Sequence, residues 1–508
     1  MNAPDDPSGE HRSSQHQATP MSPPPCTGLA ALEARLAHDL ACLQLPAPRW
    51  TPALQHQGHA VADVAIIGAG MAGLALAASL QHKGLAVSVF DQAPAGLEGP
   101  WATTARMETL RSPKQLAGPA LGLPALTFRA WFEAQFGAQQ WQALDKIGRL
   151  QWMDYLRWYR QVLGLDVRNG HRITEVLPHA DGLDELRLQA GGTEHTAWAR
   201  RLVLATGRAG LGRPAIPGFA EHLPPARWMH SADPCDYSFV KGLRIGVVGA
   251  GASAMDSAVT ALEHGAAAVH LLIRRADIPR INKSKGASNP GFVHGHARLT
   301  DDWKWRIRHY IHEQQVPPAR GSLLRLSRHS NVSFHLGCAV NSVIDSAAAL
   351  QVHTTQGAIE LDFLILATGF KLDWAQRPML RHIAPHVRQW KDRYQPLAGQ
   401  DDAELSEAPD LGPAFEFQPR PGADCPGLER VHCFCYPAAL SLGVISGDIP
   451  AISEGAQQLA TDLAGLLYAE DIEHHFARMQ AYAEPEVLGD EWVASPLPAM
   501  PDAPADRA

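Results

Sequence analysis

Apolar and polar positions repeat in the same order in two segments of the chain, residues 61–91 and 242–275. Each segment has a short apolar run, a glycine-rich turn, an alanine-rich stretch and a second apolar run. The pattern predicts a strand, a turn, a helix and a second strand in both places. The first segment ends at an acid, Asp91, and the second ends at two bases, Arg274 and Arg275.

The pattern elsewhere predicts how these two units are joined. An apolar strand over residues 202–205 ends in Thr206-Gly207, and residues 363–369 repeat that strand with the same Ala-Thr-Gly ending. One such strand follows each glycine-rich unit, which predicts two related domains, the second inserted into the first. Residues 331–344 and 349–360 are predicted to form a small antiparallel set.

Helical spacing is clearest before and between these units. Leucines spaced as on one helix face predict a first helix that stops before Pro46. A tryptophan-rich region over residues 128–163 is predicted to be largely helical. Its four tryptophans are expected to pack in a core, with an aromatic substrate pocket as the alternative; they are Trp131, Trp141, Trp152 and Trp158.

The first turn, Gly68-Ala-Gly-Met-Ala-Gly73, has the spacing of a pyrophosphate cradle. In that motif the first glycine permits a tight turn, the second lets the backbone approach phosphate, and the third lets helix and strand pack closely. The phosphates lie on free N–H groups at the helix N-terminus. Asp91 ends the next strand, where a carboxylate accepts hydrogen bonds from a ribose diol. This unit is predicted to bind FAD.

The second turn has Gly249 and Gly251, with the accepted variant Ala254 at the third position. A carboxylate at the end of the next strand would repel a 2′-phosphate, whereas guanidinium groups bind one through charge-assisted contacts. Arg274 and Arg275 therefore predict NADPH, with a solvated basic turn as the alternative. Lys283 and Lys285 either help to hold the 2′-phosphate or lie in a solvated loop.

These motifs, in this order, resemble the class B flavoprotein monooxygenases, which include flavin-containing monooxygenases, Baeyer–Villiger enzymes and bacterial amine N-hydroxylases. The chain also resembles bacterial flavoproteins that are labelled as linked to potassium transport or metal resistance. The resemblance covers roughly residues 58–465. It implies that Asp448, after Gly447, bonds the ribityl chain of the flavin, and that Trp101 flanks the isoalloxazine.

The resemblance further implies that Arg106, Thr109 and Arg111 lie near the cofactors. The catalytic residues stay open, and no metal site is predicted, because pairs such as His294 and His296 lack a full set of ligands. The predicted cofactor-binding residues are Gly68, Gly70, Met71, Ala72, Gly73, Asp91, Trp101, Arg106, Thr206, Gly207, Gly249, Gly251, Ser253, Ala254, Arg274, Arg275, Thr368, Gly369, Gly447 and Asp448.

The fold class predicted is α/β, with two Rossmann-like dinucleotide-binding domains and the NADPH domain inserted into the FAD domain. The predicted boundaries are a disordered tail at 1–27, an N-terminal helix and linker at 28–57, the first part of the FAD domain at 58–215, the NADPH domain at 216–335, the second part of the FAD domain at 336–485 and a flexible tail at 486–508.

The function that the resemblance implies is NADPH-dependent hydroxylation of a small organic substrate by O₂ through a flavin C4a-hydroperoxide. The substrate would be a nitrogen-containing compound or a heterocycle such as urate. One departure keeps two alternatives open: a linker fingerprint of the family retains His230 and Ser231, but prolines and alanine replace its Phe, Gly and aromatic positions. The alternatives are an NADPH oxidase or acceptor reductase, and a non-catalytic redox sensor or transporter accessory protein.

Composition excludes other classes. A net charge of −8 with pI near 6.3 argues against general attraction to nucleic acid or anionic lipid. No stretch is apolar enough to predict a membrane span, and the first residues lack a secretory apolar region. Seven scattered cysteines suit the cytoplasm, and Cys433 and Cys435, one residue apart in an apolar run, do not match the dithiol of a disulfide reductase.

Overall fold

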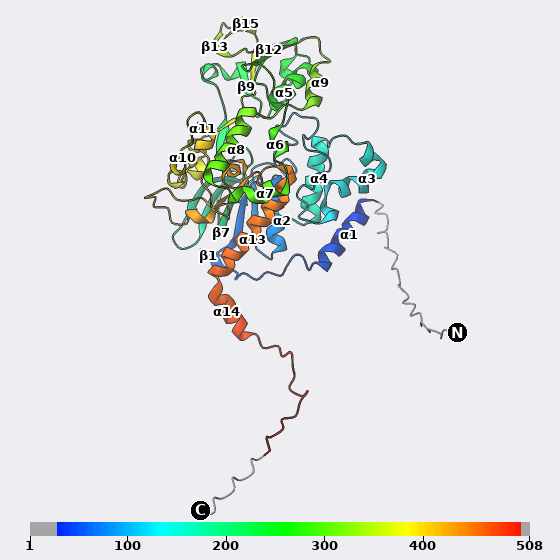
Figure 1. Ribbon diagram of the computed structural model, residues 1–508, viewed down its shortest axis with the longest axis vertical. Helices are drawn as coiled ribbons and strands as arrows, with labels where there is room; N and C mark the ends of the chain where they lie inside the picture. The colour runs from blue at the N-terminus through cyan, green and yellow to red at the C-terminus, as the bar shows by residue number, and fades with distance from the viewer. Residues whose placement is uncertain (1–27, 499–508) are drawn as a thin grey trace, which may run out of the picture.

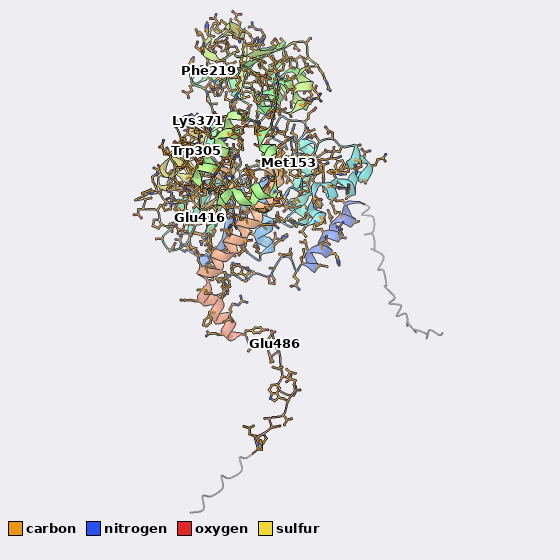
Figure 2. All side chains as sticks on the ribbon, viewed as in Figure 1. Met153, Phe219, Trp305, Lys371, Glu416 and Glu486 are labelled. Atoms are coloured by element: carbon orange, nitrogen blue, oxygen red, sulfur yellow. The ribbon has the colours of Figure 1, made fainter. Side chains whose placement is uncertain are left out.

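The computed structural model describes residues 28–498, so the predicted tail at 1–27 and residues 499–508 of the other predicted tail lie outside it. The chain forms two α/β units, one above the other in Figure 1. Helix α14 (Ile472–Ala481) and the segment after it project from the lower unit, and Glu486 on that segment lies well away from the body (Figure 2).

The lower unit is built on an eight-stranded sheet. In spatial order six strands are β4 (Val167–Asn169), β3 (Val87–Asp91), β2 (His59–Ile67), β7 (Thr193–Leu204), β6 (Asp184–Ala190) and β5 (Arg172–Pro178). Off this path β1 (Gln55–His56) pairs with β2, and β18 (Val431–Cys433) pairs with β7. Strands β4, β3, β2, β7 and β18 are parallel to one another, whereas β6 is antiparallel to both β7 and β5. Residues 61–67 of β2 are all buried, which explains why they are apolar except for Asp63.

Helices pack against this sheet and against one another. Helix α2 (Met71–His82) follows β2 through the glycine turn and packs against α13 (Ile452–Glu470). Helix α1 (Leu29–Cys42) packs against α3 (Phe128–Ala143), and α4 (Arg149–Val162) follows. The short helices α10 (Trp390–Arg393), α11 (Ala403–Ser406) and α12 (Ala439–Leu442) belong to the C-terminal part.

The tryptophan-rich region is a packed core. Each of its four predicted tryptophans is at most 6% exposed, and they surround Phe128 and Tyr155, with the rings of Trp152 and Tyr155 5.0 Å apart. None of the four lines the cavity described below. Their predicted packing role is confirmed, and they do not form an aromatic substrate pocket.

The upper unit has a five-stranded parallel sheet. Its order is β12 (Val332–Leu336), β11 (Ala268–Ile273), β10 (Arg244–Val248), β16 (Phe363–Leu366) and β9 (Trp228–His230). Helix α5 (Ala252–Glu263) packs on it, and α6 (Lys283–Gly286), α7 (Pro290–Gly295), α8 (Asp301–Gln314) and α9 (Arg320–Leu326) follow β11. Strands β13 (Val340–Asp345), β14 (Leu350–Thr354) and β15 (Gly357–Leu361) form an antiparallel sheet.

Strand β12 corrects the prediction that residues 331–344 lie wholly in the antiparallel set. It pairs parallel with β11 instead, from Val269 opposite Val332 to Ile273 opposite Leu336. The physical reason is the length of the connection, because a parallel crossover needs a dozen or more residues and the segment from α6 to α9 provides them.

Two short strands mark where the chain passes between the units. Strand β8 (Gly212–Pro214) leaves the lower unit and pairs antiparallel with β17 (Phe370–Leu372), which returns to it. Strand β16 lies between β10 and β9 in the upper sheet. Strand pairing therefore places residues 336–366 with the upper unit, beyond the boundary predicted at residue 335.

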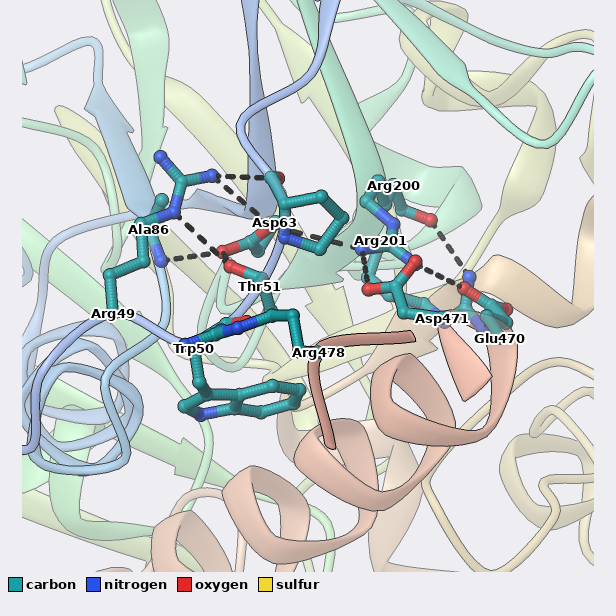
Figure 3. A network of polar contacts seen from close by, with 11 residues as sticks. Arg49, Trp50, Thr51, Asp63, Ala86, Arg200, Arg201, Glu470, Asp471 and Arg478 are labelled. Carbon is teal, nitrogen blue, oxygen red and sulfur yellow. Dashed lines mark hydrogen bonds and ion pairs between the residues drawn. The ribbon is translucent and has the colours of Figure 1, made fainter. Parts of the chain in front are cut away.

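A buried ion-pair network ties the C-terminal helices to the base of the lower sheet (Figure 3). Asp63 accepts hydrogen bonds from Thr51 Oγ1 at 2.6 Å and from the Ala86 N–H at 2.8 Å. Arg200 on β7 is 2.7 Å from the carboxylate of Asp471, where α13 meets α14. Asp63 and Arg200 lie within β2 and β7, and no residue of this network lines the cavity described below, so we interpret the network as structural.

Candidate active site

A single cavity of about 3130 Å³ is lined by both glycine turns and by the C-terminal Gly447-Asp448. Pockets for one small molecule are typically about 300–1,000 Å³, so this cavity has room for more than one ligand. Because its walls come from both units, ligands held by the two turns would face each other across it.

The first turn requires glycine at two positions for the protein's own packing. Gly68 has φ +105°, and a Cβ there would lie 2.5 Å from the carbonyl oxygen of Ala205. A Cβ on Gly73 would lie 1.9 Å from the carbonyl oxygen of Gly68. Gly70 differs, because a Cβ there would only contact Gly99 at an ordinary 3.7 Å. The missing side chain at Gly70 therefore leaves space on the cavity side, where a phosphate would approach.

The second turn repeats this geometry. Gly249 has φ +137°, and a Cβ there would lie 2.5 Å from the carbonyl oxygen of Ala367. Each glycine turn thus closes on the alanine of its own Ala-Thr-Gly strand, which explains why the two motifs occur together twice. A Cβ added to Gly251 would meet no atom within 4 Å, and Ala254 is fully buried under the turn.

Most of the other predicted residues also line the cavity. Asp91 lies at the end of β3, and its carboxylate accepts the N–H of Ala69 at 2.7 Å. The lining residues from the predicted set are Gly68, Gly70, Met71, Ala72, Asp91, Trp101, Thr206, Gly207, Gly249, Gly251, Ser253, Arg274, Arg275, Thr368, Gly369, Gly447 and Asp448. Gly73 and Ala254 do not line the cavity. They lie under the two turns, where each helix packs closely against its turn.

The predicted 2′-phosphate residues lie at an accessible edge of the cavity. Arg274 and Arg275 are both exposed and both line it, and Arg275 donates to the Glu313 carbonyl at 3.0 Å. Lys285 lines the cavity as well, whereas the Lys283 ammonium lies 6.0 Å from the Tyr310 ring centroid. This edge of the cavity is therefore positively charged, and arginines stand where the first unit has Asp91.

The C-terminal motif faces the cavity from the lower unit. Asp448 precedes a 3-10 turn (Ile449–Ala451) that leads into α13. Burial raises the pKa of Asp448, and the positive charges of Arg308 and Arg111 oppose that shift. Thr109 and Arg111 also line the cavity.

Arg106, which the resemblance places near the cofactors, does not line the cavity. Its guanidinium donates to the Thr103 carbonyl at 2.7 Å and the Cys235 carbonyl at 2.8 Å, and it lies 5.3 Å from the Tyr237 ring centroid. Arg106 therefore ties the loop of the lower unit to the segment that enters the upper one. Its role in the structure is to join the two units.

Comparison with known proteins identifies the family. A model of the pyridine nucleotide-disulphide oxidoreductases matches residues 62–287. An FAD-dependent urate hydroxylase from Xanthomonas campestris pv. campestris is 38% identical over 467 residues, which cover 91% of this chain and 98% of the relative. The chain belongs to the family of this FAD-dependent hydroxylase.

Solved structures share the fold at much lower identity. An ornithine hydroxylase from Pseudomonas aeruginosa has a TM-score of 0.63 at 17% identity and covers 79% of this chain and 98% of that chain. An L-lysine 6-monooxygenase from Pseudomonas syringae has a TM-score of 0.61 at 18% identity and covers 79% and 99%. The two-unit α/β fold predicted from the sequence is confirmed, and the family membership makes the protein a flavin-dependent oxidoreductase.

The two retained residues of the linker fingerprint, His230 and Ser231, are both buried. His230 is 1% exposed at the end of β9, where its Nδ1 accepts the Ala232 N–H at 3.1 Å. Burial lowers the pKa of His230. Neither His230 nor Ser231 lines the cavity, so the retained residues of the fingerprint hold the entry strand of the upper unit.

The cysteine pair does not form an accessible redox centre. The Sγ atoms of Cys433 and Cys435 lie 3.5 Å apart, but both residues are at most 1% exposed. Burial raises the pKa of the Cys433 thiol, which disfavours the reactive thiolate. Among residues 28–498, no group of three or more His, Cys, Asp and Glu side chains is placed to hold a metal ion, and no helix is long and apolar enough to cross a bilayer.

The cavity-wall residues that sequence reasoning missed include Arg208, Arg308 and Tyr436. Arg208 follows the first Ala-Thr-Gly, and its guanidinium lies 4.1 Å from the ring centroid of Tyr436, which comes from a segment far along the chain. Arg308 lies on α8, a helix with several charged residues in which nothing local distinguishes it. The only signal for Arg208 was its position after the motif.

Proposed function

We propose that the protein is an FAD-dependent, NADPH-using monooxygenase that hydroxylates urate or a closely related oxo-heterocycle. The observation that carries this proposal is the 38% identity to a urate hydroxylase along 98% of that enzyme's length. The cavity supports the proposal, because it is lined by the glycine turn with Asp91, by the glycine turn with Arg274 and Arg275, and by the C-terminal Gly447-Asp448. The small-molecule substrate and O₂ would meet the cofactors there.

The residues of the lower unit fit FAD. The turn from Gly68 to Gly73 leaves room for a pyrophosphate at the N-terminus of α2, where backbone N–H groups are free to donate. Asp91 keeps lone pairs for the ribose diol, since each carboxylate oxygen accepts more than one hydrogen bond. Asp448 would bond the ribityl chain, and the start of α13 would stabilise negative charge on the flavin.

The residues of the upper unit fit NADPH. Gly251 leaves open space at the N-terminus of α5 for the pyrophosphate. Arg274 and Arg275 supply the charge that recognises a 2′-phosphate, and Ser253 in the first turn of α5 adds a hydroxyl to the same wall. The cradle of the upper unit thus has the donor set of a phosphate site and lacks the acid that would repel one.

When bound, the flavin supplies the redox chemistry, passing the electrons of NADPH to O₂ so that one oxygen atom enters the substrate and the other leaves as water. The chain contributes binding, orientation and exclusion of water. Its two units hold the cofactors at one cavity, and the β8–β17 pair and the Arg106 contacts fix the units relative to each other. No side-chain nucleophile is needed for this reaction class.

The proposal is tested by product stoichiometry. The purified FAD-loaded protein is mixed with NADPH, urate and air, and NADPH oxidation, urate loss and hydrogen peroxide are measured together. A monooxygenase consumes about one urate per NADPH with little peroxide, whereas an oxidase releases about one peroxide per NADPH and leaves urate unchanged. Peroxide at full stoichiometry with every oxo-heterocycle tried would favour the NADPH oxidase alternative. An absence of NADPH oxidation would favour the non-catalytic one.

A further inference from the structure

Helix α8 crosses from the upper unit to the lower one. The indole Nε1 of Trp305 donates to the Gln400 carbonyl at 2.9 Å, and the Arg393 guanidinium makes two bonds to Asp301 at 2.8 and 2.9 Å. The helix also packs against α11 and α12 of the lower unit. Its position is therefore fixed by the C-terminal part of the chain, and one of its faces forms wall of the shared cavity.

Arg308, on that face, is a buried cation that lines the cavity without an ionic partner. The residue is 6% exposed, and its Nε has no hydrogen-bond partner. Within residues 28–498 no carboxylate lies at ion-pair distance from its guanidinium, whereas Arg306 on the same helix is exposed and pairs with Asp302 at 3.4 Å. An unpaired buried charge costs several kcal/mol, so its survival next to a cavity indicates a ligand that completes it.

The surroundings of Arg308 place that ligand beside the proposed flavin site. Arg308 and Arg111 both oppose the effect of burial on the pKa of Asp448, so the three side chains share one region of the cavity. Arg111 is already engaged, because it donates to the Pro317 carbonyl after α8. Arg111 keeps further N–H groups, but Arg308 is the more buried of the two and donates no hydrogen bond to any of residues 28–498, so an anion in this region gains most by binding Arg308.

We propose that Arg308 binds the negative charge of the substrate, and that the substrate is a planar oxo-heterocycle in its anionic form. This inference rests on the proposed function and deepens it. Urate is a monoanion at neutral pH, with its charge spread over a ring nitrogen and the neighbouring carbonyl oxygen. Two such acceptors side by side match the fork of a guanidinium, which binds them through charge-assisted hydrogen bonds. A neutral heterocycle of the same shape would leave Arg308 unpaired and would bind more weakly.

The experiment compares three variants of the FAD-loaded full chain. Arg308→Gln removes the charge, Arg308→Lys keeps a charge without the fork, and Arg306→Gln is the matched control on the exposed face of the same helix. Dissociation constants for urate, xanthine and orotate are measured at a mildly alkaline pH, where all three are anions, from changes in the absorbance of the oxidised flavin. FAD content and the anaerobic rate of flavin reduction by NADPH are measured for each protein.

The expected result is that Arg308→Gln weakens anion binding by roughly 10- to 100-fold, the range for a hydrogen bond to a charged group. Arg308→Lys falls between it and the unsubstituted protein, Arg306→Gln binds normally, and FAD content and reduction rate stay unchanged in all of them. Equal anion affinity in Arg308→Gln would overturn the inference. Loss of FAD or slow reduction at unchanged anion affinity would also overturn it, because Arg308 would then serve a cofactor.

The two proposals fail in different ways. If the protein binds xanthine or orotate through Arg308 but neither binds nor hydroxylates urate, urate is excluded as the substrate and the anion site stands. If urate is hydroxylated with unchanged affinity in Arg308→Gln, the proposed function stands and the anion site is excluded. If the unsubstituted protein binds none of the three anions, the inference is overturned whatever the turnover assay shows.

Discussion

The backbone N–H of Ala69 donates to the Asp91 carboxylate at 2.7 Å, which joins the glycine turn after β2 to the end of β3. The second oxygen of Asp91 accepts the Ala93 N–H at 2.8 Å. One side chain therefore orients the turn and faces the cavity at the same time. This double role links the stability of the turn to cofactor binding.

Replacing Asp91 with alanine is expected to lower FAD affinity at least about tenfold, since the N–H groups of Ala69 and Ala93 and the proposed ribose contact lose their acceptor. Released flavin fluorescence on dilution measures the loss. Asp181→Ala is the matched control, because Asp181 also accepts a backbone N–H, from Leu183 at 3.3 Å, but in an exposed turn. Normal FAD retention in Asp91→Ala would remove this residue from the site.

The two glycines of the second turn are expected to respond differently to alanine. Gly251→Ala introduces a Cβ into open space, so the melting temperature should stay unchanged while NADPH affinity falls about tenfold or more. Gly249→Ala should destabilise the upper unit itself, because its Cβ would meet the Ala367 carbonyl and φ is +137°. Calorimetry and NADPH titration separate the two effects. Normal NADPH binding by Gly251→Ala would argue against a phosphate at this turn.

The double variant Arg274→Ala with Arg275→Ala is expected to raise KM for NADPH roughly 10- to 100-fold while leaving KM for NADH nearly unchanged, because only NADPH carries the 2′-phosphate. Steady-state oxidation of both nucleotides measures the change in preference. Arg280→Ala is the control, since Arg280 is exposed and pairs with Asp277 at 2.9 Å. An equal rise in KM for both nucleotides would show that the two arginines do not recognise the 2′-phosphate.

His432 is expected to make stability fall as the solution becomes acidic. Burial lowers its pKa to about 3, below the ordinary value of 6.5, so the unfolded chain binds the proton more readily than the folded one. Its contribution is fully present above pH 6.5 and is lost as the pH falls toward the folded pKa, by about 2 kcal/mol between pH 6.5 and 5.

His432→Asn keeps a donor toward the Ala414 carbonyl, which His432 Nδ1 contacts at 2.7 Å, and removes the titration. Urea unfolding at pH 7.5 and pH 5 should therefore show a smaller loss of stability in this variant than in the unsubstituted protein. His294→Asn, at an exposed residue, should keep the full loss. Equal losses in all three proteins would contradict the prediction.

The glycine turns, the acid and arginine strand ends and the two Ala-Thr-Gly strands were all predictable from the sequence. Each depends on residues close together in the chain: a positive φ at Gly68, the period of α2, or the apolar run of β2. The packing of Trp152 and its neighbours followed from helical spacing in the same way.

Arg106 and Arg308 show where that reasoning ends. The sequence places Arg106 in a loop that resembles a flavin-contacting segment, but its partner is the Cys235 carbonyl, more than a hundred residues along the chain. Arg308 looks like any charged residue of a polar helix, and only the docking of Trp305 on the lower unit buries it at the cavity.

The sequence by itself thus determined the two cradles and the charge at the end of each, because turn geometry and strand and helix periods are set by neighbouring residues. Tertiary structure alone decided which strand joins which sheet, where the chain returns at β17, and that α8 brings an unpaired guanidinium to the shared cavity. Those outcomes depend on packing between segments that are distant in the chain, and no local pattern carries that information.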